Sequence, residues 1–223
     1  MALDKFRAAP LPSPPGEWDP QYMRQVIRVL ETYFSQLDSR AANNASQYTA
    51  DFFYGSGVHL SFPFGQFQSN VDQNAAAIDV AYAVTYTQSD FLDGITLSSG
   101  SRLTVPTEGI YTVTFSLQFK NTVNDAQDID IWIRKNGVDI PDTNSRFSIP
   151  ARKSTGNPSH LIATTPVMIQ LASNDYIQVM WRVSDIGVNM EHFPAVTAVP
   201  GTTPAIPATP SAIVQVRFTS EIP

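Results

Sequence analysis

From about residue 78 to the C-terminus, the sequence alternates apolar and polar residues with a period of two. Six runs show the alternation over five residues or more: 80–86, 111–119, 129–133, 167–171, 177–181 and 213–218. Successive side chains of a strand point to opposite faces, so this period predicts strands that bury one face. Shorter runs at 95–97, 102–105, 138–140, 145–149 and 160–163 raise the expected number of strands to between eight and eleven.

Turn-forming residue pairs separate these runs, and no helical pattern lies between them. The pairs are Asp93-Gly94, Ser99-Gly100, Glu108-Gly109, Asn136-Gly137 and Asn174-Asp175. Such pairs adopt the backbone conformations that tight hairpins need. Many short strands joined by turns indicate an all-β fold, and we predict an antiparallel sandwich.

The composition excludes several classes of protein. The chain has 223 residues and no cysteine, which excludes a disulfide framework, a zinc-thiolate site, an iron–sulfur cluster and a cysteine nucleophile. Its net charge of −6, without long Lys/Arg runs, argues against nucleic-acid binding. The sequence contains no apolar run long enough to cross a membrane and no apolar core of a signal peptide near residue 1, so we expect no membrane insertion and no signal-peptide secretion.

Residues 1–18 are rich in proline and predict an extended arm without a core of its own. The residues that would dock on a partner are Pro10, Pro12, Pro14, Pro15 and Trp18. Proline fixes φ and removes an amide donor, which favours polyproline II geometry. A flexible leader and a docking arm that becomes ordered on a partner both remain open.

Residues 19–50 carry a heptad helix or stalk. Asp19 is a good N-cap, Pro20 suits the first helical position, and Trp18 with Met23 fits a hydrophobic staple. The apolar seam is spaced 4, 3, 4, 3, 4 and consists of Met23, Ile27, Leu30, Phe34, Leu37 and Ala41. An amphipathic helix packed on its own domain would show the same spacing. We favour self-association, because so short a helix is marginal alone, and the bulky Phe34 favours a trimer.

Residues 51–77 form an aromatic-rich connector in this interpretation. It contains Phe52, Phe53, Tyr54, Phe62, Phe64 and Phe67, and Gly55, Gly57, Pro63 and Gly65 are expected to interrupt any regular element. The rings either cover the base of the following domain or form an anchoring patch for another protein.

Five segments of residues 64–220 together resemble the C1q/TNF-like jelly roll, and in particular such modules of tailed, marine-type bacteriophage virion proteins. They are FGQFQSNVDQNAAAIDVAYAVTY, SRLTVPTEGIYTVTFSLQF, DIDIWIRKNGVDIPDTNSRFSIP, LASNDYIQVMWRVS and PAIPATPSAIVQVRF. The chain has Asn174-Asp175 where animal members usually have Gly-Asp. The resemblance implies a jelly-roll knob at 78–223 and a homotrimer packed through apolar and aromatic residues of one sheet.

The number of aromatic residues in the knob supports the same trimer. Eight rings exceed what we expect one small sandwich to bury: Tyr82, Tyr86, Tyr111, Phe115, Phe119, Trp132, Tyr176 and Trp181. The excess is expected to lie between subunits, and a heptad helix in front of the knob would set the register of the trimer.

The sequence gives little support for catalysis. His59, His160 and His192 are far apart and show no metal-ligand spacing, and nucleotide-binding loops and nucleophile elbows are absent. Two acidic groups, Asp90 with Asp93 and Asp125 with Asp128 and Asp130, lack the EF-hand spacing and are read as turn and edge-strand carboxylates. We therefore expect no enzyme activity and no cofactor.

The loop from Glu191 to Pro210 contains five prolines and precedes the last strand. We favour a stiff crossover packed along the sandwich. The alternative is a surface that contacts a receptor or a neighbouring subunit, for which His192, Phe193 and Pro194 are the candidate residues.

The whole pattern predicts a non-enzymatic phage structural protein located in the virion and assembled in the host cytoplasm. It would be a trimeric capsid decoration protein or head fibre, held by its N-terminal arm on the major capsid protein or on portal or tail proteins. The alternative is a tail fibre or receptor-binding protein that recognises host surface glycans. A cellular C1q/TNF-like ligand is a third and weaker interpretation.

Overall fold

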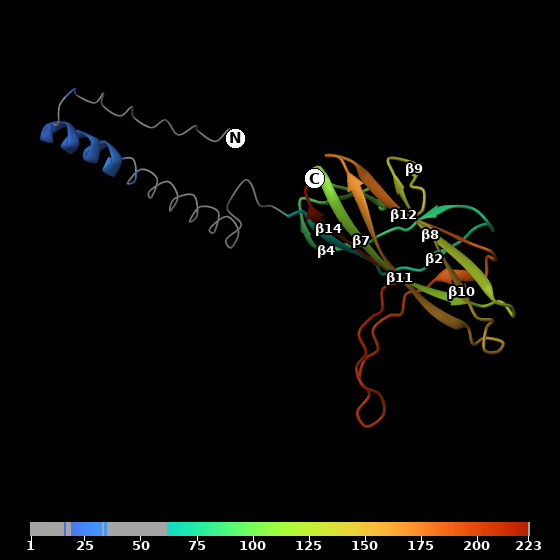
Figure 1. Cartoon of the computed structure of the whole chain (residues 1–223). Coiled ribbons are helices and arrows are strands. Elements are labelled where there is room, and N and C mark those ends of the chain that lie inside the picture. The colour runs from blue at the N-terminus through green and yellow to red at the C-terminus, as the bar shows by residue number, and fades with distance from the viewer. Residues whose placement is uncertain (1–15, 17–18, 33, 35–61, 223) are drawn as a thin grey trace. The chain divides into compact units, whose positions relative to one another are not determined.

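The computed structural model describes residue 16, residues 19–32, residue 34 and residues 62–222. The chain divides into two compact units, Met1–Ser61 and Phe62–Pro223. The first contains a helix over residues 20–32, with residue 34 also helical, and the second is almost entirely β (Figure 1). Leu37, Ala41 and the residues proposed for docking, Pro10, Pro12, Pro14, Pro15 and Trp18, lie outside the described residues.

The helix begins where the sequence predicted. Asp19 Oδ1 accepts a hydrogen bond from the amide of Gln21 at 2.8 Å, which is the N-cap contact. Pro20 is the first helical residue and has no amide to satisfy. Within the last described turn, Thr32 Oγ1 donates to the carbonyl of Arg28.

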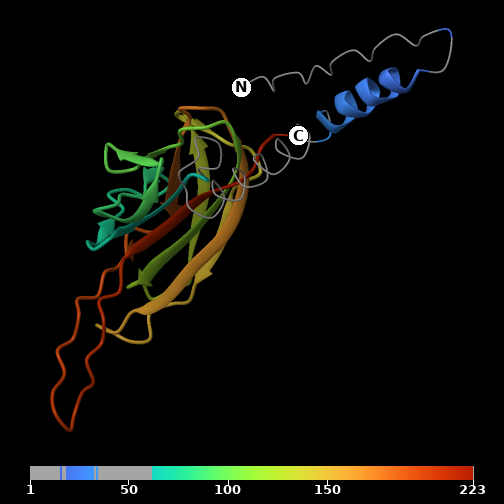
Figure 2. The same ribbon diagram turned by 90° about the vertical axis from the view of Figure 1, so that its left-hand side faces the viewer.

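The second unit is a sandwich of two antiparallel sheets (Figures 1 and 2). The first sheet has the order β2-β13-β7-β14-β1-β4, and β11 pairs with the other edge of β7. Its strands are β1 (Phe64–Ser69), β2 (Gln73–Asn74), β4 (Gln88–Asp93), β7 (Gly109–Asn121), β11 (Ser159–Leu171), β13 (Val188–Met190) and β14 (Ala212–Ser220).

The second sheet has the order β10-β8-β12-β6-β5, with β3 paired to β12 and β9 to β8. Its strands are β3 (Tyr82–Ala83), β5 (Thr96–Ser98), β6 (Arg102–Thr104), β8 (Gln127–Lys135), β9 (Val138–Asp139), β10 (Ser145–Ile149) and β12 (Tyr176–Val183). All ladders between these strands are antiparallel, as the alternation predicted.

The core fills the space between the sheets with the inward residues of each alternating strand. In β7 every odd-numbered residue is buried and every even-numbered residue is half-buried on the outer face. Five rings are almost wholly buried: Tyr86, Tyr111, Phe115, Phe119 and Trp181. One sandwich therefore buries most of the eight aromatic residues by itself, and our expectation that their number requires a trimer was wrong.

The sandwich begins earlier than the predicted boundary at residue 78. β1 and β2 fall within the expected connector 51–77, and both belong to the first sheet. We read Gly65 as a breaker, but it lies in β1, where a Cβ would meet the ring of Phe67 at 2.7 Å. The glycine is needed for close packing and does not interrupt the strand.

Most of the predicted turns occur, with one exception. Ser99, Gly100, Asn136, Gly137 and Asn174 all have positive φ, as tight turns require. Gly109 instead opens β7, where a Cβ would lie 2.3 Å from the ring of Phe218 and 2.9 Å from the carbonyl of Ser220. This glycine allows the end of β14 to approach β7.

Candidate functional site

The most prominent feature of the sandwich is a long hairpin between β13 and β14, which we call the proline hairpin (residues 191–210). It projects from the sandwich in both views (Figures 1 and 2). Residues 193–202 are all exposed, as are most of the residues that return to β14. The crossover packed along the sandwich, which we favoured, is therefore wrong. Residues with so little support from their own unit are available to a partner.

The two limbs of the proline hairpin pair at every third residue. Phe193 exchanges two backbone hydrogen bonds with Thr209, Val196 with Ile206, and Val199 with Thr203, all between 2.8 and 3.0 Å. A β-ladder repeats every two residues, whereas polyproline II repeats every three. Proline follows five of the six paired residues, at Pro194, Pro200, Pro204, Pro207 and Pro210. The hairpin therefore resembles two paired polyproline II segments.

The proline hairpin has no charged side chain between Phe193 and Pro210. Phe193, Val196, Val199 and Ile206 are among the exposed large hydrophobic residues of the molecule. Residues that are three apart in polyproline II point the same way, so Phe193, Val196 and Val199 share one side. An uncharged apolar projection of this kind is typical of an interaction surface.

The base of the proline hairpin contains the three residues predicted as a binding loop. The amide of His192 donates to Asp72 Oδ1 at 2.8 Å, and His192 Nδ1 lies 2.9 Å from the carbonyl of Thr209. The ring of Phe193 lies against that of His160 at 5.7 Å. His192 thus holds the base together, whereas Phe193 and Pro194 are exposed.

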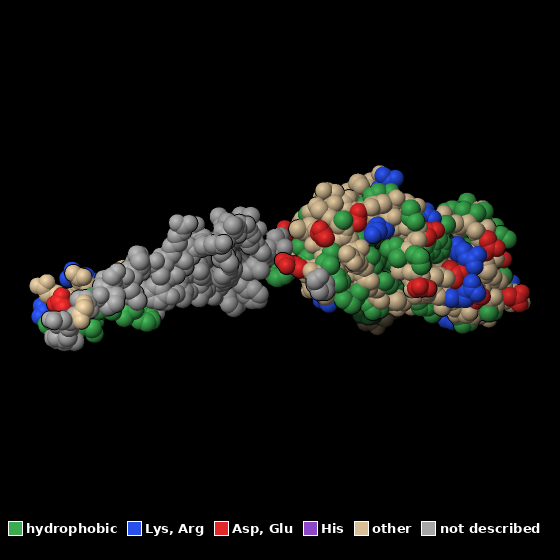
Figure 3. All heavy atoms as spheres, turned by 45° about the horizontal axis from the view of Figure 1, so that its top comes forward, with side chains coloured by type: hydrophobic (Ala, Val, Ile, Leu, Met, Phe, Trp, Pro, Cys, Tyr) green, Lys and Arg blue, Asp and Glu red, His purple; other side chains and the backbone are tan. Residues whose placement is uncertain are grey.

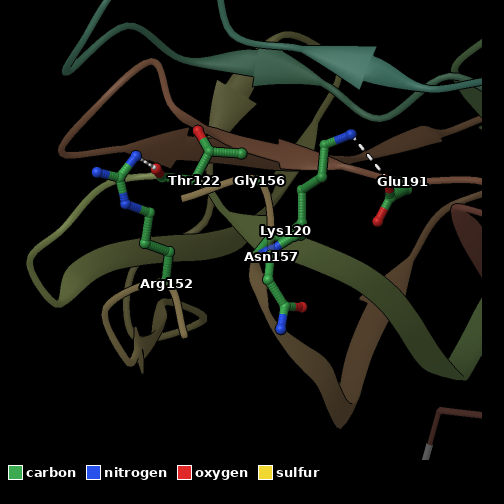
Figure 4. Close-up of a pocket in the computed structure, with 7 residues that line it drawn as sticks. Lys120, Thr122, Arg152, Gly156, Asn157 and Glu191 are labelled. Carbon is green, nitrogen blue, oxygen red and sulfur yellow. Dashed lines mark hydrogen bonds and ion pairs between the residues drawn. The ribbon is translucent and has the colours of Figure 1, made fainter. Parts of the chain in front are cut away.

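A cavity of about 300 Å³ lies beside this base, at one end of β7. It is lined by Lys120, Thr122, Arg152, Gly156, Asn157, Pro158 and Glu191 (Figure 4). Lys120 Nζ contacts Glu191 Oε1 at 2.8 Å, and His160 Nε2 contacts the other oxygen of Glu191 at 2.9 Å. In Figure 4, Arg152 and Lys120 flank Thr122 on opposite sides.

Arg152 is the unusual residue of this cavity. Its Nη1 donates to the carbonyl of Thr122 at 3.3 Å, and it forms no ion pair with any described carboxylate. Arg134, Arg146 and Arg182 of the same sandwich each have an aspartate partner. A guanidinium has five donors, so most of those on Arg152 remain available to an anionic or hydroxyl-bearing ligand. No pattern in the sequence indicated this cavity, because its residues come from three separate segments.

A second apolar patch lies on the first sheet, away from the proline hairpin. We call it the aromatic corner and define it as Phe62, Phe64 and Phe91, all of which are exposed. Phe91 of β4 pairs with Gln66 of β1, so its ring shares the outer face with Phe64. The rings of Phe62 and Phe218 lie 5.9 Å apart. Of the aromatic residues of the predicted connector, Phe67 is buried in the core, Phe62 and Phe64 are exposed, and Phe52, Phe53 and Tyr54 lie outside the described residues.

The helix exposes the described part of its apolar seam. Met23, Ile27 and Leu30 are 43%, 50% and 39% exposed, and Phe34 is 58% exposed. These residues recur at heptad spacing on one side of the helix. Apolar side chains at this spacing gain stability when a second helix covers them.

Three of the five acidic residues considered for calcium bind other side chains. Asp130 accepts hydrogen bonds from Arg146, Arg182 and Asn144, Asp128 pairs with Ser148, and Asp90 accepts from Gln66 and Gln68. Among the described residues, no group of three or more His, Asp or Glu side chains is arranged to hold a metal ion. None of the helices in that part of the chain is long and apolar enough to cross a membrane.

The sequence matches no protein-family model, and no curated protein matches it significantly.

Proposed function

We propose that this chain is a non-enzymatic, cofactor-free structural protein of a tailed-phage virion that assembles as a homotrimer. The observation that carries the proposal is the exposed seam of Met23, Ile27 and Leu30 on a well-capped helix. A single helix of this length is marginal in water, and burial of the seam against two copies would stabilise it.

The strand order supports a C1q/TNF-like jelly roll for the knob. The eight principal strands form two sheets, with β11-β7-β14-β1 in one and β10-β8-β12-β6 in the other. Along the chain they alternate between the sheets except at β8 and β10, which are neighbours in the second sheet. Two four-stranded antiparallel sheets connected in this way are the arrangement of a jelly roll. The resemblance of the sequence segments then favours the phage form of this module.

The distribution of charge supports association through the outer face of the first sheet. That face carries mainly hydroxyl and amide side chains, such as Thr112, Thr114, Ser116, Gln66 and Gln215. The outer face of the second sheet instead carries ion pairs, including Arg146–Asp130, Arg182–Asp79 and Arg134–Asp139. Basic and acidic side chains lie side by side on the side of the sandwich where Figure 1 places β8 and β10 (Figure 3). A subunit interface avoids unnecessary burial of charge, so the first sheet is the better contact face.

The proposed attachment is the N-terminal arm on another virion protein, which makes the knob a capsid decoration or head fibre. Deletion of residues 1–18 is expected to leave a folded trimer that is lost from purified particles, because the sandwich has a hydrophobic core of its own. Quantitative mass spectrometry of particles made with the full or shortened chain measures this. The control keeps residues 1–18 at full length but replaces the prolines in it, Pro10, Pro12, Pro14 and Pro15, by alanine. Normal incorporation of the shortened chain would contradict attachment by the arm.

The second candidate function is a receptor-binding head that recognises host surface glycans. The cavity at Arg152 and Asn157 favours it, because cationic and amide donors beside the carboxylate of Glu191 suit a hydroxyl-rich ligand. The two functions differ in one measurement. A receptor-binding knob blocks infection when added to host cells as pure trimer, and a decoration protein does not.

A further inference from the structure

We propose that the proline hairpin of one copy binds the aromatic corner of a second copy of this chain. This contact goes beyond the trimer proposed above, since neither the helix seam nor the centre of the first sheet takes part in it. It would join one trimer to the next.

The backbone geometry of the proline hairpin defines the kind of surface that it fits. Pairing at every third residue places Phe193, Val196 and Val199 on one side at polyproline II spacing. Proline-rich segments in this conformation bind grooves lined by aromatic rings. The aromatic corner offers such rings, with Phe91 69% exposed and Phe64 on the same outer face.

The prolines also exclude the other common way in which a hairpin binds. A free strand edge pairs with a new strand through its amides, but Pro194, Pro200, Pro204 and Pro207 have none to offer. The limbs must therefore be recognised by their side chains and carbonyl oxygens.

Charge and size favour a protein partner over other occupants. The 18 residues from Phe193 to Pro210 carry no charge, so they have nothing to attract phosphates of nucleic acid or an anionic membrane. A typical stable interface takes about 20–30 residues from each partner. The 18 residues of the proline hairpin come close to that size.

The contact must be intermolecular, because the two surfaces lie at opposite ends of β14. Ala212, the first residue of β14, follows the proline hairpin, whereas Phe218 near its other end bonds to Pro63 beside the corner. Nine strand residues span about 30 Å, and the hairpin projects away from the strand (Figure 2). A contact between two different surfaces is head-to-tail and builds rings or rows of subunits.

The absence of native cysteine allows a direct test by disulfide trapping in the full chain. Ile206→Cys protein is mixed with Phe91→Cys protein at high concentration with oxidised glutathione, and the mixed disulfide dimer is quantified by mass spectrometry. The control replaces Phe91→Cys with Val138→Cys, at a residue that is 70% exposed in β9. We expect the hairpin–corner pair to cross-link at least about tenfold faster than the control pair, because binding raises the effective concentration of the thiols.

Equal rates for the two pairs would overturn the proposal. The pair Val199→Cys with Phe64→Cys repeats the test at two other exposed residues. A disulfide geometry that is unfavourable at the first pair alone therefore does not determine the result. Addition of Val196→Asp to the Ile206→Cys protein is expected to remove the advantage, since a carboxylate would be buried against aromatic rings. Cross-linking of the hairpin in particles to a different virion protein, without the corner, would likewise overturn it.

Discussion

Replacement of both Ile27 and Leu30 by aspartate is expected to convert the proposed trimer into monomers. Both residues lie on the exposed seam of the helix, and in the trimer three copies of each would face one another. Each carboxylate would then be buried beside like charges, at a cost of about 3 kcal/mol or more. That corresponds to at least roughly a hundredfold weaker association for each site.

The matched control for the seam is Gln25→Asp with Thr32→Asp. The two substitutions add the same charge as the seam variant, but on the opposite side of the helix. Gln25 and Thr32 are both exposed. Sedimentation velocity at micromolar concentration is expected to give a monomer for the seam variant and a trimer for the control. Far-UV circular dichroism should show an intact β signal in both, since the sandwich has its own core. A seam variant that remains trimeric would show that the helix does not hold the subunits together.

The second large effect concerns Asp130 on the outer face of the second sheet. Its side chain is only 5% exposed and accepts hydrogen bonds from Arg146 at 2.9 Å and Arg182 at 2.8 Å. Burial alone would raise the pKa of Asp130, but the hydrogen bonds from Arg146, Asn144 and Arg182 outweigh it and lower the pKa to about 2. The ionised carboxylate therefore stabilises the folded state.

Because the pKa of Asp130 is lower in the folded chain than in the unfolded chain, its stabilisation is complete above about pH 4. It is lost as the pH falls from about 4 through 2. The lowered pKa of Asp130 corresponds to roughly 2 kcal/mol of stabilisation of the folded state. Asp130→Asn is expected to lower the free energy of unfolding by about 2 kcal/mol at pH 7 and to remove this part of the acid dependence.

Urea unfolding of the two proteins at pH 7, 4 and 2, at one protein concentration, measures the effect of Asp130. The control is Asp125→Asn, an exposed carboxylate in the loop between β7 and β8. The control should follow the wild-type dependence on pH. If the free energy of unfolding fell by the same amount between pH 4 and pH 2 in the wild type and in Asp130→Asn, the ion pairs of Asp130 would not stabilise the folded state.

The strands that were predicted well from the sequence are those in which apolar and polar residues alternate along the whole strand. Three strands, β7, β12 and β14, each bury the side chains of one face. The period of two therefore predicted the bounds of these strands to within a few residues. β11 was predicted as two runs, because Pro166 interrupts the pattern. In the structure β11 is a single strand that pairs only with β7 among the described strands, where an edge proline is tolerated.

The elements that the sequence did not predict depend on partners far away in the chain. All six residues of β4 are exposed, so it shows no alternation, and it exists because it pairs with β1. The sequence likewise did not indicate that the proline hairpin projects from the sandwich, although the three-residue spacing of Pro204, Pro207 and Pro210 is visible in it. The residues around Arg152 meet only after folding.

The exposed seam, the outer face of the first sheet with its mainly hydroxyl and amide side chains, and the proline hairpin are the surfaces on which the proposed assembly depends. The most direct test is the mass of the full chain at micromolar concentration by sedimentation equilibrium. The account predicts that the smallest species has three times the chain mass of 24.5 kDa. A species of 24.5 kDa under these conditions would contradict it.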